Sequence, residues 1–371
     1  MARQAGCQTL PSARYARQGK GLPTDYSAGS RRRRNRPLGP RVSVLLPAYN
    51  ATPTLPAALR SILRQSEPEW ECVIVDDGSE DDTLACARTF AQRDARFTVV
   101  STPHRGLVAA LNTGLAHCRA DIVARMDADD LMHRRRLAAQ LTMLAAQSQL
   151  VAVGCHVRMF PRAALRDGLR AYERWLNSID SPRRVQTEAF VECPIVHPTL
   201  MIRRIVLSQL GYRDCGWAED YDLILRLITR GDHIGVVPQR LLCWRNGPRR
   251  LTWSGASYAL DRLVACKAAF LAAHFLAGTD TYILWGFGDT GRALQRALLQ
   301  HGKRPSHVVE VHRGRLGNVI HGAPVVGYEQ LPRLPHHPVV VSVAGEGPRQ
   351  QIRDVMATMG FRELDDFVCA A

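Results

Sequence analysis

The 371-residue sequence lacks any uninterrupted apolar run of about 18 residues, so no segment predicts a membrane-spanning helix. The first residues lack an apolar core, and we therefore expect no secretory signal. None of the ten cysteines forms a CxxC pair, which argues against a zinc or redox motif. Most lie in apolar runs, as Cys72 does, and are expected to be reduced core residues. With 46% hydrophobic and 22% charged residues, the composition excludes wholesale disorder and a disulfide-rich miniprotein.

The net charge of +15 is unevenly distributed along the chain. Residues 1–40 contain nine basic residues and one acid, and they show no apolar period. We interpret this segment as a disordered basic arm. Its run of four arginines, 31–34, leaves open contact with nucleic acid or anionic lipid, but a solvated tail is the more ordinary explanation. The rest of the chain is mildly basic, which suits phosphorylated substrates.

From residue 41 onward, short apolar runs alternate with segments of helical spacing, which predicts a parallel sheet covered by helices on both faces. The expected strands are 42–47, 70–75, 97–101 and 122–126, and the expected helices are 54–65, 81–90 and 107–117. Acidic residues follow two of the strands, where ligands bind in open α/β sheets. Asp76 and Asp77 follow the second strand, and Asp127, Asp129 and Asp130 follow the fourth.

Like charges this close repel one another, and a divalent cation would relieve the repulsion. Such a cation commonly completes its shell with substrate phosphates, so Asp127-Ala128-Asp129 is a candidate clamp for a metal and a diphosphate. The alternative is purely structural: Asp129 or Asp130 would cap a helix beginning near Leu131.

Five segments in order resemble family 2 glycosyltransferases of the GT-A fold. They are residues 44–50 (VLLPAYN), 75–79 (VDDGS), 127–130 (DADD), 196–199 (VHPT) and 218–222 (AEDYD). The resemblance spans about residues 41–250. It implies a GT-A type, mostly parallel sheet flanked by helices. It also implies an inverting, metal-dependent hexosyltransferase that uses Mn²⁺ or Mg²⁺. The enzyme would move a sugar from a nucleoside diphosphate donor, commonly UDP-linked, to a hydroxyl of a saccharide or glycolipid.

The resemblance also implies residue roles. Pro47, Tyr49, Asp76, Asp77 and Asp127 would bind the donor nucleotide, and Asp127 and Asp129 would hold the metal. Asp220 would be the catalytic base, with His197 and Glu219 near the donor or acceptor.

The chemistry of sugar transfer independently requires a cation and a basic carboxylate. A departing diphosphate needs a cation, and an attacking hydroxyl needs a carboxylate. Asp220 and Glu219 also stand where a helix start would favour acids without any catalytic role. The roles of Glu219 and Asp222 are not separated by the sequence, and one alternative is that Asp222 faces solvent. Arg105 and Arg245 are candidates for pairing with the diphosphate, or are surface residues.

A second strand–turn–helix pattern begins near residue 279. Gly286, Gly288 and Gly291 follow an apolar strand and precede a helix, and Glu310 lies 19 residues beyond the last of them. This is the spacing of a dinucleotide fingerprint, so NAD(P) is a candidate ligand. Lys303 is the only lysine of residues 279–371 and no Tyr-x-x-x-Lys pair is present, so no redox role is assigned. The segment resembles small nucleotide-binding-like domains fused to bacterial sugar transferases.

We therefore predict four parts: a basic arm (1–40), a GT-A domain (41–250), a helical connector (251–278) and a small Rossmann-like α/β domain (279–371). The favoured function is sugar transfer in cell-surface polysaccharide or glycolipid synthesis, in the cytoplasm, with at most peripheral contact at the inner face of the membrane. Two alternatives stay open. One is an NAD(P)-dependent enzyme that modifies sugar nucleotides through its C-terminal domain. The other is a nucleic-acid-binding protein acting through the arm, although no DNA- or RNA-reading module is present.

Overall fold

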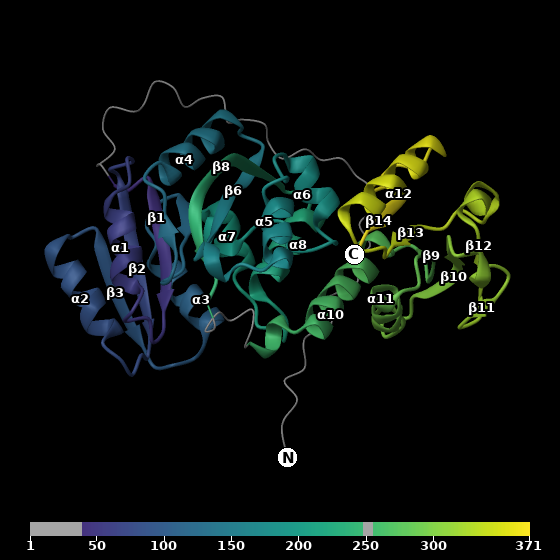
Figure 1. The fold of residues 1–371 in the computed structure, drawn as a ribbon. Coiled ribbons are helices and arrows are strands. Elements are labelled where there is room, and N and C mark those ends of the chain that lie inside the picture. The colour runs from purple at the N-terminus through teal and green to yellow at the C-terminus, as the bar shows by residue number, and fades with distance from the viewer. Residues whose placement is uncertain (1–38, 248–254) are drawn as a thin grey trace, which may run out of the picture.

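The computed structural model describes residues 39–247 and 255–371, so the predicted basic arm lies almost wholly outside the described residues. Two sheets divide the described chain, and a helical segment runs between them (Figure 1). The larger sheet has eight strands in the order β3-β2-β1-β4-β7-β6-β8-β5. Their bounds are β1 Val42–Ala48, β2 Trp70–Asp77, β3 Phe97–Thr102, β4 Ile122–Arg125, β5 Leu131–Met132, β6 Leu150–Phe160, β7 Met201–Arg203 and β8 His233–Arg245.

The first half of this sheet is parallel, as the sequence predicted, because β1 pairs in parallel with both β2 and β4, and β2 with β3. The second half differs: β7 runs antiparallel to β4 and β6, and β5 runs antiparallel to β8. The sheet is thus mixed, although its parallel half carries the acidic strand ends. Asp76 and Asp77 occupy the last two positions of β2 instead of following it.

Eight helices accompany the large sheet in the described chain. They are α1 Leu55–Leu63, α2 Thr83–Arg93, α3 Leu107–His117, α4 Arg136–Ala146, α5 Asp167–Leu176, α6 Pro182–Glu188, α7 Arg204–Leu210 and α8 Glu219–Thr229. Helix α1 buries Leu55, Leu59 and Ile62 at helical spacing and leaves Leu63 exposed. Helix α3 lies so close to the sheet that a Cβ at Gly114 would stand 2.3 Å from a Leu45 methyl carbon.

Helix α10, Leu260–Phe270, and a π-helical turn over Leu271–Phe275 lead to the smaller sheet. Its strands, in the order β11-β12-β10-β9-β13-β14, are β9 Thr281–Trp285, β10 Arg304–Val309, β11 Val319–Ile320, β12 Ala323–Val326, β13 Val339–Val341 and β14 Phe367–Cys369. All pairs are parallel except β11 with β12. Helix α11, Asp289–Leu299, follows β9, and helix α12, Glu346–Thr358, follows β13. This is the alternation predicted near residue 279. The nine cysteines in the described part of the chain are all free, as expected.

Candidate active site

The acidic segment Asp127–Asp130 forms a short loop between β4 and β5. One carboxylate oxygen from each of Asp127, Asp129 and Asp130 lies within 4.8 Å of the other two. Helix α4 begins only at Arg136, and Leu131 starts a strand. The structural alternative, in which Asp129 or Asp130 caps a helix near Leu131, is therefore wrong. The loop presents its acids to one point in space without a capping role.

Two arginines, at the ends of β4 and β8, hold this loop. Arg125, almost fully buried at the end of β4, pairs with the carboxylate of Asp127. From the end of β8, the backbone N–H of Arg245 donates to Asp130 Oδ1 over 2.7 Å, and its Nε donates to the carbonyl oxygen of Asp129 over 2.6 Å. The guanidinium of Arg245 is thus occupied by the loop itself, while Arg105 is exposed. The loop is fixed before any ligand arrives.

The carboxyl groups of the loop are short of positive charge. Burial, followed by the charge of Asp127, raises the pKa of Asp129 to about 6. Burial also raises the pKa of Asp130 well above its usual range, and Asp130 Oδ2 has no hydrogen-bond partner. A buried carboxylate oxygen without a partner is costly unless a ligand satisfies it. The cluster is therefore suited to a hard cation with oxygen ligands.

At the end of β2, Asp77 fixes the loop that follows β3. Its two carboxylate oxygens accept hydrogen bonds from the backbone N–H groups of Arg105 (3.0 Å) and Gly106 (2.8 Å). The His104 Nδ1 lies 2.9 Å from Asp77 Oδ2, and the His104 ring stacks on Tyr49 at 4.1 Å between centroids. Asp77 thus orders a flat surface of two rings beside the carboxyl ends of β1 and β2.

Three neighbouring positions complete this edge. Pro47 lies buried in β1, and Asp76 is buried with its Oδ1 unpartnered. Gly78 has a φ of +69°, and a Cβ there would lie 2.5 Å from the backbone nitrogen of His104, so only glycine fits the turn.

Helix α8 begins with two adjacent carboxyl groups in opposite electrostatic states. Burial, followed by the charge of Glu219, raises the pKa of Asp220 to about 8. Burial also opposes ionisation of Glu219, but His197 outweighs it and lowers the pKa of Glu219. The His197 Nδ1 lies 3.4 Å from Glu219 Oε1, and the Tyr258 hydroxyl donates to Glu219 Oε2 over 2.7 Å. Paired groups with pKa values pushed apart are typical of acid–base sites.

Charged residues of the loop Asp127–Asp130 and of the start of α8 shift the pKa of the same groups. The carboxylates of Asp220, Glu219 and Asp127 all raise the pKa of Tyr258, after the larger effect of burial. The charge of Arg125, the partner of Asp127, lowers the pKa of Asp220 in turn. The charges of the two acidic sites therefore act on common groups.

Sequence reasoning missed three contributors to this region and left the placement of a fourth open. Arg125 and Tyr258 were not singled out, nor was Tyr212, whose hydroxyl lies 3.2 Å from His197 Nε2. The alternative in which Asp222 faces solvent is wrong. It is fully buried, with Arg213 at 2.6 Å and Arg226 at 2.7 Å. Arg226 stands four residues after Asp222 on the same helix, a spacing that indicates an ion pair, whereas Arg213 comes from a preceding loop that spacing does not reveal.

The glycine turn of the smaller sheet has three distinct geometries. Gly286 adopts a φ of +94°. A Cβ at Gly288 would meet nothing within 4 Å, whereas a Cβ at Gly291 would lie 2.3 Å from the Gly286 carbonyl oxygen. Glu310 is buried, and its Oε1 accepts from the Phe287 N–H (3.0 Å) and from Arg315 (2.9 Å). The fingerprint acid thus bonds back to the turn.

Comparisons with known proteins give the family and the fold of the chain. Residues 43–211 match the model of the family described as Glycosyl transferase family 2. The putative glycosyltransferase EpsE of Bacillus subtilis (strain 168) is 34% identical over 199 residues, which cover 52% of this chain and 68% of EpsE. The amylovoran biosynthesis glycosyltransferase AmsE of Erwinia amylovora is 28% identical over 250 residues, covering 65% of this chain and 91% of AmsE.

A solved structure shares the fold. The crystal structure of S. aureus TarS 1-349 gives a TM-score of 0.50 at 17% identity and covers 70% of this chain and 71% of that one. At this identity the likeness shows the fold alone, and it agrees with the GT-A type expected for the larger sheet. Among the helices that the structure describes, none is both long and apolar enough to cross a membrane.

Proposed function

The chain belongs to glycosyl transferase family 2, and from this premise we propose that it transfers a sugar from a UDP-linked nucleoside diphosphate donor to a hydroxyl acceptor with inversion at the anomeric carbon. The amylovoran biosynthesis relative supports a role in polysaccharide or glycolipid synthesis. We place this activity in the cytoplasm, with peripheral contact at the inner face of the membrane.

Asp127 and Asp129 would hold a divalent cation, Mn²⁺ or Mg²⁺. The residues present fit such an ion, since three carboxyl groups converge within 4.8 Å and Asp130 Oδ2 is buried without a partner. When bound, the cation supplies positive charge to the diphosphate leaving group. Arg125 and Arg245 keep the loop in place, so the carboxylates need little rearrangement to bind it.

Asp220 would act as the base. Its carboxyl, at the N-terminus of α8, would accept the proton of the acceptor hydroxyl while that oxygen bonds to the anomeric carbon and the nucleoside diphosphate departs. A pKa of about 8 suits proton removal near neutral pH. Glu219 and His197 would orient the start of the helix, because Glu219 is bonded to Tyr258 and approached by His197.

The observation that carries the proposal is that charges of both acidic sites act on one group, the hydroxyl of Tyr258 that bonds Glu219. One transferred sugar must lie between the diphosphate and the acceptor, so the cation site and the base must face the same space. The common action of Asp127, Glu219 and Asp220 on the Tyr258 hydroxyl supports this arrangement. The rings of Tyr49 and His104, with Pro47, Asp76 and Asp77, would form the nucleoside side of the site.

The test is donor turnover by the purified full chain. With Mn²⁺ and a panel of sugar nucleotides, one donor should release nucleoside diphosphate. Asp129→Ala should abolish release, whereas Asp220→Asn should keep donor binding and lose transfer. Asp82→Ala, at an exposed aspartate outside these contacts, is the matched control. Unchanged donor binding and turnover in Asp129→Ala would contradict the cation site, and loss of donor binding in Asp220→Asn would contradict its assignment as base.

A second proposal concerns residues 279–371, which we interpret as a Rossmann-like domain joined through the connector 251–278. The three glycines support nucleotide binding, because their geometries match the roles of tight turn, open approach and helix–strand contact in a dinucleotide site. Gly286, Gly288, Gly291 and Glu310 would line it, with NAD(P) as the candidate ligand. Titration of NAD(H) and NADP(H) into the full chain tests this, with Gly288→Val as the variant that blocks approach. Absence of binding to the unmodified chain would refute it.

A further inference from the structure

The two sheets are joined by a common apolar core as well as by the connector. One cluster of buried apolar side chains contains residues from both units and from the helix between them. Its members include Ala189, Phe190, Tyr221 and Leu225 from the larger unit, Phe270 and Leu271 from the connecting helix, and Leu284, Val340 and Val368 from the smaller unit. Because Tyr221 follows Asp220 directly, this cluster reaches the start of α8. The smaller unit is therefore packed against the helix that carries the proposed base.

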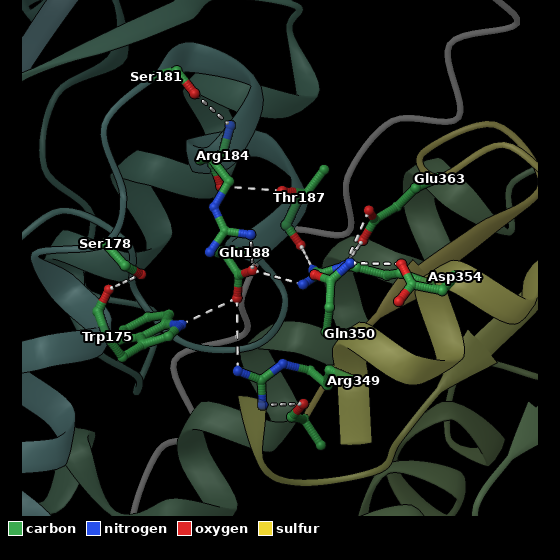
Figure 2. Close-up of polar contacts among 12 residues, drawn as sticks. Trp175, Ser178, Ser181, Arg184, Thr187, Glu188, Arg349, Gln350, Asp354 and Glu363 are labelled. Carbon is green, nitrogen blue, oxygen red and sulfur yellow. Dashed lines mark hydrogen bonds and ion pairs between the residues drawn. The ribbon is translucent and has the colours of Figure 1, made fainter. Parts of the chain in front are cut away.

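Glu188, the last residue of α6, is the centre of a buried ionic cluster between the two units (Figure 2). Its side chain is 1% exposed, and its Oε1 lies 2.9 Å from Arg353 Nη1. Its Oε2 accepts from Trp175 Nε1 over 3.1 Å and lies 3.8 Å from Arg349. Arg349 and Arg353 both belong to α12, so one helix of the smaller unit supplies two cations to one buried carboxylate.

The smaller unit and helix α10 make further contacts with the residues next to Glu188. Arg353 also donates to the Thr187 carbonyl oxygen over 3.3 Å and pairs with Glu363 at 2.9 Å. Lys267, on α10, donates to the carbonyl oxygen of Val191 over 2.6 Å and to that of Ala370 over 3.3 Å. Cationic side chains thus hold the backbone of the segment 187–191 at both of its ends.

The same segment contacts α8 on its other side. The Tyr221 hydroxyl donates to the Ala189 carbonyl oxygen over 2.7 Å, and Tyr221 is fully buried. The Tyr221 backbone N–H donates to Asp220 Oδ1 over 2.7 Å. A continuous series of contacts therefore runs from Arg353 through Glu188 and Ala189 to Tyr221 and Asp220.

We propose that residues 279–371 position the catalytic base of the transferase: α12 holds the segment 187–191, and through the Ala189–Tyr221 hydrogen bond this segment sets the placement of the Asp220 carboxyl. The inference rests on the proposed function, because it takes Asp220 as the base. Arg353 and Tyr221 are positioning residues, since neither contacts the reacting atoms. The smaller unit thus contributes to the transfer step whether or not it binds a ligand of its own.

Tyr221→Phe tests the last contact of the series with the loss of a single oxygen atom. We expect kcat to fall about tenfold while the KM for the donor changes less than twofold, because a small misplacement of a reacting group costs rate more than affinity. Tyr282→Phe is the matched control. It removes another buried tyrosine hydroxyl from the same core, but that hydroxyl has no hydrogen-bond partner, so kcat should be unchanged.

Arg353→Gln tests the other end of the series, with Arg362→Gln as control, since Arg362 is an exposed arginine of the same unit. We expect kcat to fall in Arg353→Gln and partial rescue by Arg353→Lys, which keeps the charge. A lower Tm with unchanged kcat per folded molecule in both Tyr221→Phe and Arg353→Gln would overturn the inference. Full activity of Asp220→Asn would instead overturn the proposed function, so the two failures are distinguishable.

Discussion

The raised pKa of Asp220 predicts how the rate of transfer depends on pH. If Asp220 accepts the proton, only the molecules with an ionised Asp220 react. The pH profile of kcat/KM reports the ionisation of the free enzyme. With a pKa of about 8, kcat/KM should rise about tenfold for each pH unit below 8 and level off above it. An aspartate of ordinary pKa would give a flat profile over this range.

The structure also predicts how the profile responds to a change of charge. Burial and Glu219 are the main causes of the raised pKa, and Glu192 adds to it. Glu192→Gln removes that charge while keeping an acceptor for the Cys193 N–H, which Glu192 Oε1 now bonds at 3.1 Å. The rising limb should therefore move to lower pH. Glu329→Gln, at an exposed glutamate of the smaller unit, should leave it in place.

The stability of the fold gives an independent measurement of the same ionisation. An aspartate whose pKa rises on folding binds its proton more tightly in the folded state, so its stabilising contribution is present at low pH. That contribution is lost as pH rises from the unfolded value toward 8, at about 1.4 kcal/mol for each pH unit. Asp220→Asn carries no charge and should therefore have a higher Tm than the unmodified chain at pH 9, with little difference at pH 4.

The assay is release of nucleoside diphosphate between pH 6 and 9 at saturating Mn²⁺, with Tm measured in the same buffers. A flat kcat/KM profile, combined with an unchanged Tm for Asp220→Asn at pH 9, would refute the reasoning. A flat rate profile together with the raised Tm would show that Asp220 titrates as described but does not limit the reaction.

Three further predictions concern the buried Asp222 ion pair, the glycine turn and the cation site. Asp222→Ala should lower the free energy of unfolding by about 3–5 kcal/mol in urea titrations, because it leaves the buried Arg226 without its carboxylate; a loss below about 1 kcal/mol would contradict the buried pair. Gly291→Ala should lower Tm, since its Cβ would meet a backbone oxygen at 2.3 Å, whereas Gly288→Ala should fold normally; equal Tm values would contradict the close helix–strand contact. Chelation with EDTA should lower the Tm of the enzyme saturated with nucleoside diphosphate, and added Mn²⁺ should restore it; Asp129→Ala should show neither change.

Local patterns were sufficient to predict the parallel half of the larger sheet. The runs beginning at Val42, Trp70 and Phe97 are apolar and are followed by helical spacing, and each forms the strand expected of it. The glycine turn after β9 was equally accessible, because its backbone geometry depends on the residues of the turn itself. The start of α8 was expected at Asp220 and lies one residue earlier, at Glu219.

Long-range pairing was not accessible in the same way. The antiparallel placement of β7 against β4 depends on contacts between segments about 80 residues apart. Arg245 was a candidate for pairing with the diphosphate, and only the fold shows that it bonds Asp130, 115 residues earlier. Tyr258 belongs to the predicted connector, yet it bonds Glu219, 39 residues earlier. These contacts join segments that lie far apart in the sequence, and neither composition nor periodicity predicts which segments meet.

The apolar cluster common to both units limits how the protein can be re-engineered. A chimaera that joins residues 279–371 to another transferase would leave Leu284 and Val340 without the native apolar cluster around Phe190 and Tyr221. It would also leave Arg349 and Arg353 without the buried carboxylate of Glu188. A functional chimaera would therefore have to include α6 and α8 of this chain together with residues 279–371. The segment that must be transferred is larger than the smaller sheet.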